Sequence, residues 1–252
     1  MDDFKEKLIS LLHYPEISWG AVLQMLKKDP TLKNIYNSQI QFPHQTSLFP
    51  PNTSSNSSEK SSSITPNPDI IRDQIRQYET NDIAVITILD KEYPPLLKEI
   101  YQPPWALFAK GDLSLLEKDP KLAVVGSRQA TQYGKNAIRM IFPGLIDQGV
   151  LIVSGLARGI DALAHEYAIK NNGNTIAVIA GGFYHIYPKE NLNLALEMMK
   201  NQLVLSEYPP DTRPLRWHFP SRNRIISGLS KGTLIIEAKR KSGSLITANF
   251  AV

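Results

Sequence analysis

The pattern of apolar and polar positions divides the chain into three parts. Over residues 1–40, apolar side chains such as Leu8 and Leu12 recur at helical spacing among charged ones, which predicts a small helical domain. Residues 41–75 begin with a stretch rich in Ser, Asn and Pro that offers little apolar surface, so we interpret them as a linker or insertion, with a compact surface loop as the alternative. Residues 76–252 form the predicted core domain.

Short apolar runs alternate with helical stretches throughout the core domain. Strands are predicted near 83–89, 122–126, 150–155, 175–182, 203–207 and 233–238, and helices near 95–100, 133–147, 160–170 and 190–200. Wholly apolar strands separated by helices are typical of a mostly parallel sheet that is covered on both faces. The predicted fold class is therefore α/β, with a doubly wound, mostly parallel sheet.

Composition narrows the classes of function. A chain of 252 residues that is 42% apolar can bury one sizeable core and a smaller one, and its lack of cysteine excludes disulfides, thiol catalysis and iron–sulfur clusters. Its five histidines show no ligand-like spacing, so we expect no metal and no other cofactor. No apolar run approaches the ~18 residues of a membrane span. The acidic start MDDFKEKLIS has no signal-peptide features, so we expect a cytoplasmic protein without a membrane partner.

Charge is concentrated in one short segment. Residues 211–241 hold eight Lys or Arg residues against two acids, whereas the formal net charge of the whole chain is only +4. Trp217, His218 and Phe219 lie among these cations. Cations interleaved with aromatic rings suggest a surface that meets nucleic acid, and a solvated charged face is the plain alternative.

The candidate ligand-binding residues lie in loops that directly follow the predicted strands. In a parallel sheet these loops share the carboxyl edge, where helix N-termini attract anions. The first loop offers Gly126 for close backbone approach, Ser127 for hydrogen bonding and Arg128 for bidentate phosphate binding. It lacks the GxGxxG spacing of a dinucleotide site. An exposed Arg in a tight turn is the alternative.

The second loop, SGLARGID, begins at Ser154 and contains two glycines. Main-chain N–H groups around Gly155 could converge on an anion at the start of the next helix. Arg158 is predicted either to bind phosphate or to pair with Asp161. We interpret Asp161 first as a structural cap of that helix.

The third loop, residues 180–191, combines two adjacent glycines with Tyr184, Tyr187, Lys189 and Asn191. Aromatic faces stack on bases regardless of sequence, which suits single-stranded nucleic acid. Core or rim positions are the usual alternative for tyrosines.

The fourth loop leads into a helix that we expect to begin near Ser221. Arg222 and Asn223 would then lie in its first turn, where a cation is unfavourable unless an anion is nearby. Arg224 would face away from Arg222 and is expected to take part in core packing or an internal ion pair.

Six motifs in order closely resemble the DprA/Smf family of DNA-processing proteins over about residues 80–252. They are GSR, SGLARGID, IYPKEN, SEYPP, FPSRNRIISGLS and IIEAKRKSGSLITA. The resemblance implies a Rossmann-like protein without catalytic residues that binds single-stranded DNA and protects it. It also implies that the protein helps to load the RecA recombinase during natural transformation, and that it forms a homodimer.

Carried over by position, the family's DNA pocket would use Ser127, Arg128, Lys189, Arg222 and Asn223. The loops themselves add Gly126, Gly155, Arg158 and Asn191 to the candidate DNA-binding set.

Three features depart from the family pattern. The third loop reads GGFYH where a Gly-Leu-Asp sequence is usual, and residues 53–63 suggest an insertion. The chain stops at Val252, where the family continues, so we expect a truncated core.

Two other hypotheses compete with DNA binding by the core. Gly232, Thr233 and Glu237 loosely resemble a signature of nucleotide phosphoribohydrolases, in which Glu237 would stabilise an oxocarbenium-like transition state. A structural pair of Glu237 with Lys239 is the plain alternative. The N-terminal helices could also be the partner-binding module, with the core as a scaffold.

Overall fold

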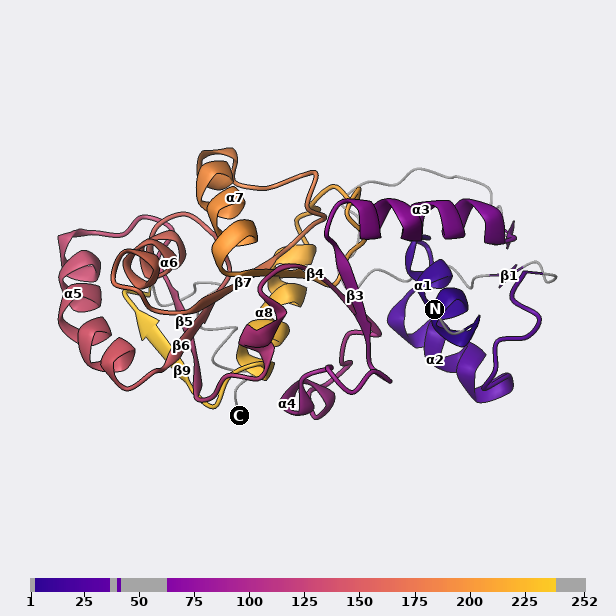
Figure 1. Cartoon of the computed structure of the whole chain (residues 1–252), viewed down its shortest axis with the longest axis horizontal. Helices are drawn as coiled ribbons and strands as arrows, with labels where there is room; N and C mark the ends of the chain where they lie inside the picture. The colour runs from indigo at the N-terminus through magenta and orange to yellow at the C-terminus, as the bar shows by residue number, and fades with distance from the viewer. Residues whose placement is uncertain (1–2, 37–39, 42–62, 239–252) are drawn as a thin grey trace, which may run out of the picture. The chain divides into compact units, whose positions relative to one another are not determined.

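The structure is a computed structural model that describes residues 3–36, 40–41 and 63–238 (Figure 1). Its contacts divide the chain into two compact units, Met1–Tyr78 and Glu79–Val252. Each unit is built around its own buried apolar residues.

The first unit is helical. It contains α1 (Asp3–Leu12), α2 (Trp19–Lys28), the short strands β1 (Ile40–Gln41) and β2 (Ser63–Ile64), and most of α3 (Pro68–Thr80). The side chain of Ser18 caps α2 by accepting a hydrogen bond from the N–H of Ala21. The core of this unit contains Leu8, Leu11, Val22, Ile71 and Ile75.

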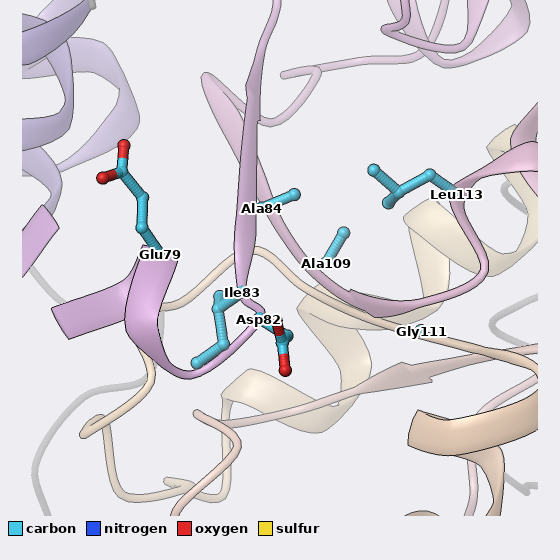
Figure 2. A pocket seen from close by; sticks show the side chains of 7 residues that line it. All are labelled: Glu79, Asp82, Ile83, Ala84, Ala109, Gly111 and Leu113. Carbon is cyan, nitrogen blue, oxygen red and sulfur yellow. The ribbon is translucent and has the colours of Figure 1, made fainter. Parts of the chain in front are cut away.

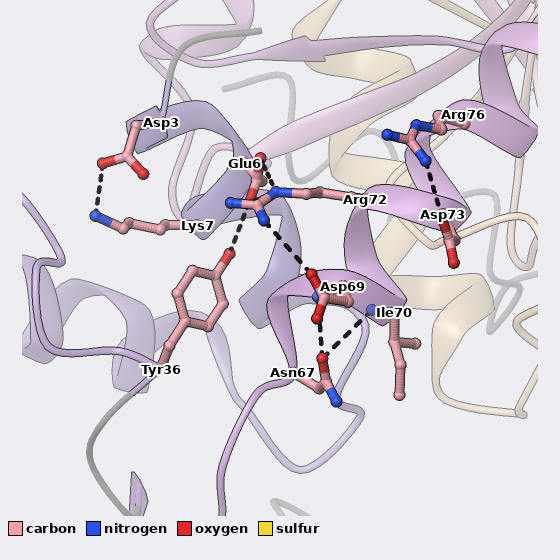
Figure 3. Close-up of polar contacts among 10 residues, drawn as sticks. All are labelled: Asp3, Glu6, Lys7, Tyr36, Asn67, Asp69, Ile70, Arg72, Asp73 and Arg76. Carbon is pink, nitrogen blue, oxygen red and sulfur yellow. Dashed lines mark hydrogen bonds and ion pairs between the residues drawn. The ribbon is translucent and has the colours of Figure 1, made fainter.

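Polar contacts join α1 to α3 within the first unit (Figure 3). The Arg72 guanidinium lies 3.0 Å from the Glu6 carboxylate, and Tyr36 donates to the same carboxylate at 3.4 Å. Nε2 of His13 lies 2.6 Å from the Tyr78 hydroxyl. The helix α3 therefore belongs to a packed unit, although it begins inside the segment 41–75 that we interpreted as a linker. Its buried Ile71, Ile75 and Tyr78 recur at helical spacing, a signal that the neighbouring Ser-rich composition had obscured.

The second unit is a seven-stranded sheet with helices. Its strands are β3 (Ala84–Thr87), β4 (Ala106–Gly111), β5 (Lys121–Gly126), β6 (Leu151–Ser154), β7 (Thr175–Ile179), β8 (Leu203–Ser206) and β9 (Thr233–Ile236). Its helices are α4 (Pro95–Lys98), α5 (Gln132–Asp147), α6 (Ile160–Lys170), α7 (Leu192–Asn201) and α8 (His218–Gly228), with 3₁₀ turns η1 (Leu113–Leu116) and η2 (Lys189–Asn191).

The strand order is β3-β4-β8-β7-β6-β5-β9. The five strands from β8 to β9 are parallel, and β4 is antiparallel to both β8 and β3. The chain builds outward from β5 to β8 and then returns to place β9 on the other side of β5. This reversal is the topological switch point of a doubly wound sheet, where ligands bind in open α/β folds. The predicted fold class is confirmed.

Apolar side chains fill both faces of this sheet. On one face Val124 and Ile152 pack with Ile138 and Phe142 of α5 and with Ala164 of α6. On the other, alternate residues of the same strands pack against α4 and α8, with Leu97, Ile225 and Ile226 buried there. Strands buried on both faces account for the continuous apolar runs that the sequence displays.

The sequence prediction missed one strand of the second unit and misplaced the start of one helix. Strand β4, in ALFAKG, had no predicted counterpart, and α8 begins at His218, three residues before the expected Ser221. Pairing between β4 and two antiparallel neighbours is a long-range property, so the local pattern alone did not reveal it.

Candidate nucleic-acid interface

The loops after β5, β6, β7 and β8 all leave the carboxyl edge of the parallel strands, as predicted. Gly159 shows how tightly the first two loops pack. It has φ of 74°, and a Cβ there would lie 2.2 Å from the carbonyl oxygen of Ser127. The next N–H, of Ile160, donates to that same oxygen at 3.0 Å. Only glycine fits this position, because both the backbone conformation and the close approach exclude a side chain.

Gly126 has a similar packing role at the end of β5. A Cβ added there would lie 2.0 Å from the carbonyl oxygen of Ile236 in β9 and 2.5 Å from the Ile160 side chain. The close approach that we predicted for a ligand is thus made by the protein's own chain.

The first loop displays Arg128 to solvent. The Ser127 hydroxyl is engaged locally, since it accepts from the N–H of Gln129 at 3.1 Å and donates to the carbonyl of Gln129 at 3.0 Å. This turn presents the exposed guanidinium of Arg128 5.8 Å above the ring of Phe219. Phe219 in turn meets Tyr187 edge to face, with ring centroids 5.6 Å apart.

We call Arg128, Tyr187 and Phe219 the cation–aromatic cluster. It brings together three of the four predicted loops, and it combines a permanent positive charge with a half-exposed tyrosine ring. A guanidinium held over an aromatic face is partly preorganised, yet it keeps donors for a phosphate. Phe219 was noted in the sequence as part of the basic segment and of the fourth loop, and no periodicity signalled its contact with Arg128.

Arg222 lies in the interior, with only 4% of its surface exposed. Its Nη1 donates to the carbonyl oxygens of Gly155, at 2.6 Å, and of Val178, at the ends of β6 and β7. Its Nε donates to the side chain of Asn223 at 3.2 Å. Burial lowers the pKa of Arg222 to about 10, and the nearby Asp161 opposes this shift. The first-turn position that suggested an anion ligand has an internal explanation, because α8 starts earlier and protein acceptors surround this cation.

Asp161 is buried beneath the second loop. Its carboxylate accepts hydrogen bonds from the N–H groups of Gly155 at 3.2 Å and Ala157 at 3.4 Å. Burial raises the pKa of Asp161, whereas Arg222 acts to lower it. Asp161 is structural, as predicted, but it closes the loop before α6 rather than capping the helix, whose N-cap is Gly159.

Gly155 fits between these two charges. A Cβ there would lie 2.6 Å from Nη2 of Arg222 and 2.7 Å from Oδ2 of Asp161. The N–H group that we expected to help to bind an external anion donates to an internal carboxylate instead.

Arg158 pairs with Glu190, not with Asp161. Its Nη2 donates to the Glu190 carboxylate at 2.7 Å, and both side chains are about half exposed. This pair raises the pKa of Arg158. Arg158 therefore lies on the surface of the loops, but its charge is balanced by a neighbour.

Lys189 and Asn191 differ in exposure although both lie in the third loop. Lys189 is exposed at the start of η2. Asn191 is buried, and its side-chain amide donates to the carbonyl oxygens of Leu156 at 2.9 Å and Ala157 at 3.1 Å. Asn191 thus ties the third loop to the second, a role that the sequence did not reveal.

The basic segment 211–241 is only partly a surface feature. Arg224 is buried and pairs with Glu207 at 2.5 Å, which confirms the predicted internal ion pair. Lys231 lies 3.1 Å from Asp119. Arg213 and Arg216 are exposed, and residues 239–241 lie outside the described residues.

Glu237 lies at the switch point, directly after β9. Its carboxylate accepts a hydrogen bond from the N–H of Thr131 at 2.9 Å, at the N-terminus of α5, and a Cβ on Gly134 would lie 2.5 Å from it. Glu237 has φ of 54°, an uncommon conformation for this residue type. An anion at a helix N-terminus is favourable. The expected partner Lys239 lies outside the described residues.

An open pocket of ≈ 350 Å³ lies elsewhere in the second unit (Figure 2). It is lined by Glu79, Asp82, Ile83, Ala84, Ala109, Gly111 and Leu113. Two carboxylates and no cation line this pocket, so it is not suited to phosphate.

Within the described residues, no group of three or more histidine, aspartate or glutamate side chains is arranged to hold a metal ion. None of the helices in that part of the chain is both long enough and apolar enough to cross a membrane.

The fold and its loops define a Rossmann-like α/β protein with a cationic, aromatic carboxyl edge. Residues 84–252 match the family model described as DNA recombination-mediator protein A, and the chain belongs to that family. It is 54% identical over 171 residues to DNA processing protein DprA of Bacillus subtilis, covering 68% of this chain and 58% of the relative. It is 47% identical over 161 residues to protein Smf of Escherichia coli, covering 64% and 43% respectively.

Solved structures agree with this assignment. DNA processing protein A from Streptococcus pneumoniae matches with a TM-score of 0.65 at 45% identity, covering 73% of this chain and 67% of that one. The Helicobacter pylori protein, whose structure is described as giving insight into its single-stranded DNA binding mode, matches with a TM-score of 0.59 at 34% identity, covering 67% and 75%. The chain thus spans little more than half the length of the B. subtilis relative.

Proposed function

We propose that this chain binds single-stranded DNA along the carboxyl edge of its parallel strands, without catalysing a reaction. The observation that carries the proposal is the cation–aromatic cluster of Arg128, Tyr187 and Phe219. It offers a phosphate ligand beside ring faces, which is the combination that single strands require. The single-strand binding described for the H. pylori relative supports the same role here.

We divide the predicted site residues into three groups. Arg128 and Lys189 are exposed and are proposed to meet phosphates directly, with Arg158 beside them. Gly126, Gly155, Asn191 and Arg222 support the loops from within. Ser127 and Asn223 are half-buried at the boundary, and we propose that they contact the strand after local rearrangement.

The experiment is a titration of fluorescent oligothymidine at several salt concentrations, comparing the wild type with Arg128→Ala. About four neutralised phosphates would give a log–log salt slope near −3 for the wild type, because a single strand releases about 0.7 counterion per phosphate. Arg128→Ala is expected to reduce this slope by about 0.7 and the affinity by roughly 10- to 100-fold, the range for a charge-assisted hydrogen bond.

Arg139→Ala is the matched control, since Arg139 is an exposed arginine in the middle of α5. It should leave both affinity and slope near the wild-type values. A wild-type slope near zero, or equal losses from Arg128→Ala and Arg139→Ala, would contradict the proposal.

We further propose that the bound strand is protected and passed to the RecA recombinase, and that the protein acts as a homodimer in the cytoplasm. The family description as a recombination mediator supports this. A RecA-dependent strand-exchange assay with DNA coated by a single-strand-binding protein tests it. Stimulation by the wild type, lost in Arg128→Ala, is the expected outcome, and no stimulation would oppose it.

The phosphoribohydrolase hypothesis gains no support from the position of Glu237. Its carboxylate accepts a hydrogen bond from the main chain of Thr131, which is a structural role. Incubation with nucleoside monophosphates is expected to release no free base.

A further inference from the structure

A second aromatic surface lies just before α8. Trp217 is 52% exposed, although tryptophan is on average a highly buried residue. Its ring meets His218 edge to face, with centroids 4.0 Å apart, and lies 6.5 Å from the ring of Tyr208. Tyr208 itself stacks on the buried His218 at 4.0 Å. The indole is therefore held by packed rings while half of its surface remains available.

Hydrogen bonds with His218 also hold the segment that carries Trp217. The N–H of Leu215 donates to Nδ1 of His218 at 3.2 Å, and the N–H of His218 donates to the carbonyl of Leu215 at 3.0 Å. A side chain fixed in advance loses little conformational entropy when it binds a ligand. An ordered, half-exposed indole is thus a suitable stacking platform.

The charges beside Trp217 identify the kind of ligand. Residues 212–217 contain Arg213 and Arg216, both exposed, and no acid. A flat ring preceded along the chain by two exposed cations complements a nucleobase and the phosphates beside it. A purely apolar partner would leave both guanidinium groups without a counter-charge.

The backbone of Trp217 lies near that of the cation–aromatic cluster, because both Trp217 and Phe219 lie at the start of α8. Trp217 and Phe219 are two residues apart, so their Cα atoms are separated by at most about 7 Å.

We infer that Trp217 is a second base-stacking site on the same bound strand, with Arg213 and Arg216 meeting the phosphates beside it. This inference rests on the proposed function. It adds a site that is built by the β8–α8 connection and not by the glycine-containing loops.

The test compares Trp217→Ala and Trp217→Tyr with the wild type in the oligothymidine titration. Trp217→Ala should weaken binding by roughly tenfold, the order of one lost base–aromatic stack. The salt slope should stay unchanged, because the indole carries no charge. Trp217→Tyr should recover much of the affinity, since it restores an aromatic face. Tyr101→Ala, which removes another highly exposed ring, should bind like the wild type.

Three results separate this inference from the proposed function. If the wild type does not bind oligothymidine, both are overturned. If Arg128→Ala weakens binding but Trp217→Ala does not, only the stacking site is overturned. If Trp217→Ala lowers the melting temperature and Trp217→Tyr fails to restore binding, the indole has a structural role and the stacking site is overturned.

Discussion

The exposed and buried layers of the carboxyl edge use the same residue types for different purposes. In the exposed layer Arg128 reaches solvent over Phe219, and its charge is open to a ligand. In the buried layer Arg222 donates to main-chain carbonyls beside Asp161. Both arginines lie in motifs that suggest phosphate binding. The difference shows that an arginine in a basic loop motif can either hold the loops in place from inside or remain exposed to contact a ligand.

The largest effect should come from the buried layer. Arg222→Leu leaves Asp161 without its compensating charge and removes hydrogen bonds from two carbonyl groups. Each buried acceptor left unsatisfied costs about 1–3 kcal/mol, so the free energy of unfolding should fall by several kcal/mol in urea denaturation. Arg139→Leu, on the exposed face of α5, should change it by less than about 0.5 kcal/mol. Similar changes in the free energy of unfolding for the two variants would show that Arg222 has no special structural role.

Gly159→Ala tests the close packing between the first and second loops. The new Cβ meets the carbonyl of Ser127 at 2.2 Å, in a backbone conformation that side chains rarely adopt. Strain of this kind costs about 1–3 kcal/mol. We expect a lower melting temperature and weaker DNA binding, because the turn that presents Arg128 must move. Gly144→Ala, where the added Cβ meets no atom within 4 Å, is the matched control. Equal melting temperatures for the two variants would show that the close packing of Gly159 against Ser127 does not contribute to stability.

Acid should destabilise the second unit through two buried histidines. Burial lowers the pKa of His165 to about 3 and that of His218 to about 4. In the unfolded chain both titrate near 6.5, so below that pH protons bind the unfolded state preferentially. Their contribution is fully present above pH 6.5 and is lost as the pH falls toward 4, by about 1.4 kcal/mol per pH unit for each histidine.

Urea denaturation of the wild type and of His218→Asn between pH 7 and pH 4.5 tests whether stability falls with falling pH for this reason. The variant should lose stability less steeply than the wild type over that range. Parallel curves would show that His218 does not contribute to the pH dependence.

The smallest effect concerns the exposed pair of Arg158 and Glu190. Glu190→Gln removes the charge that balances Arg158 without changing the shape of the side chain. Affinity for oligothymidine should rise a few-fold and the salt slope should steepen, because Arg158 becomes free to meet a phosphate. Glu197→Gln, an exposed carboxylate within α7, should have no such effect. Unchanged binding by Glu190→Gln would place Arg158 outside the DNA path.

Local sequence pattern was sufficient for much of the fold. The parallel strands and α6 were found where apolar runs and helical periodicity predicted them, because burial on both faces leaves a clear signal. Strand β4 was missed because its antiparallel partners are distant in sequence.

The sequence predicted which loops carry the candidate site, but it did not predict which of their side chains are exposed and which are buried. The loops that carry Arg128 and Arg222 were found from their place after the strands. Nothing in the sequence separated the exposed arginine from the buried one, since that distinction depends on where α8 begins and on which carbonyls lie nearby. The link from Asn191 to the second loop likewise depends on a contact between residues more than 30 positions apart.

Under the proposed function, Glu237 and Asp161 favour a polymer over a mononucleotide as the ligand. Its carboxylate already receives the main-chain donor at the start of α5, and Asp161 already receives those of the second loop. A mononucleotide would therefore find few main-chain donors and would depend on single side-chain contacts. A strand repeats such contacts, and each one raises the effective concentration of the next. Under the proposed function, the length of the ligand rather than the identity of its base determines residence on the protein.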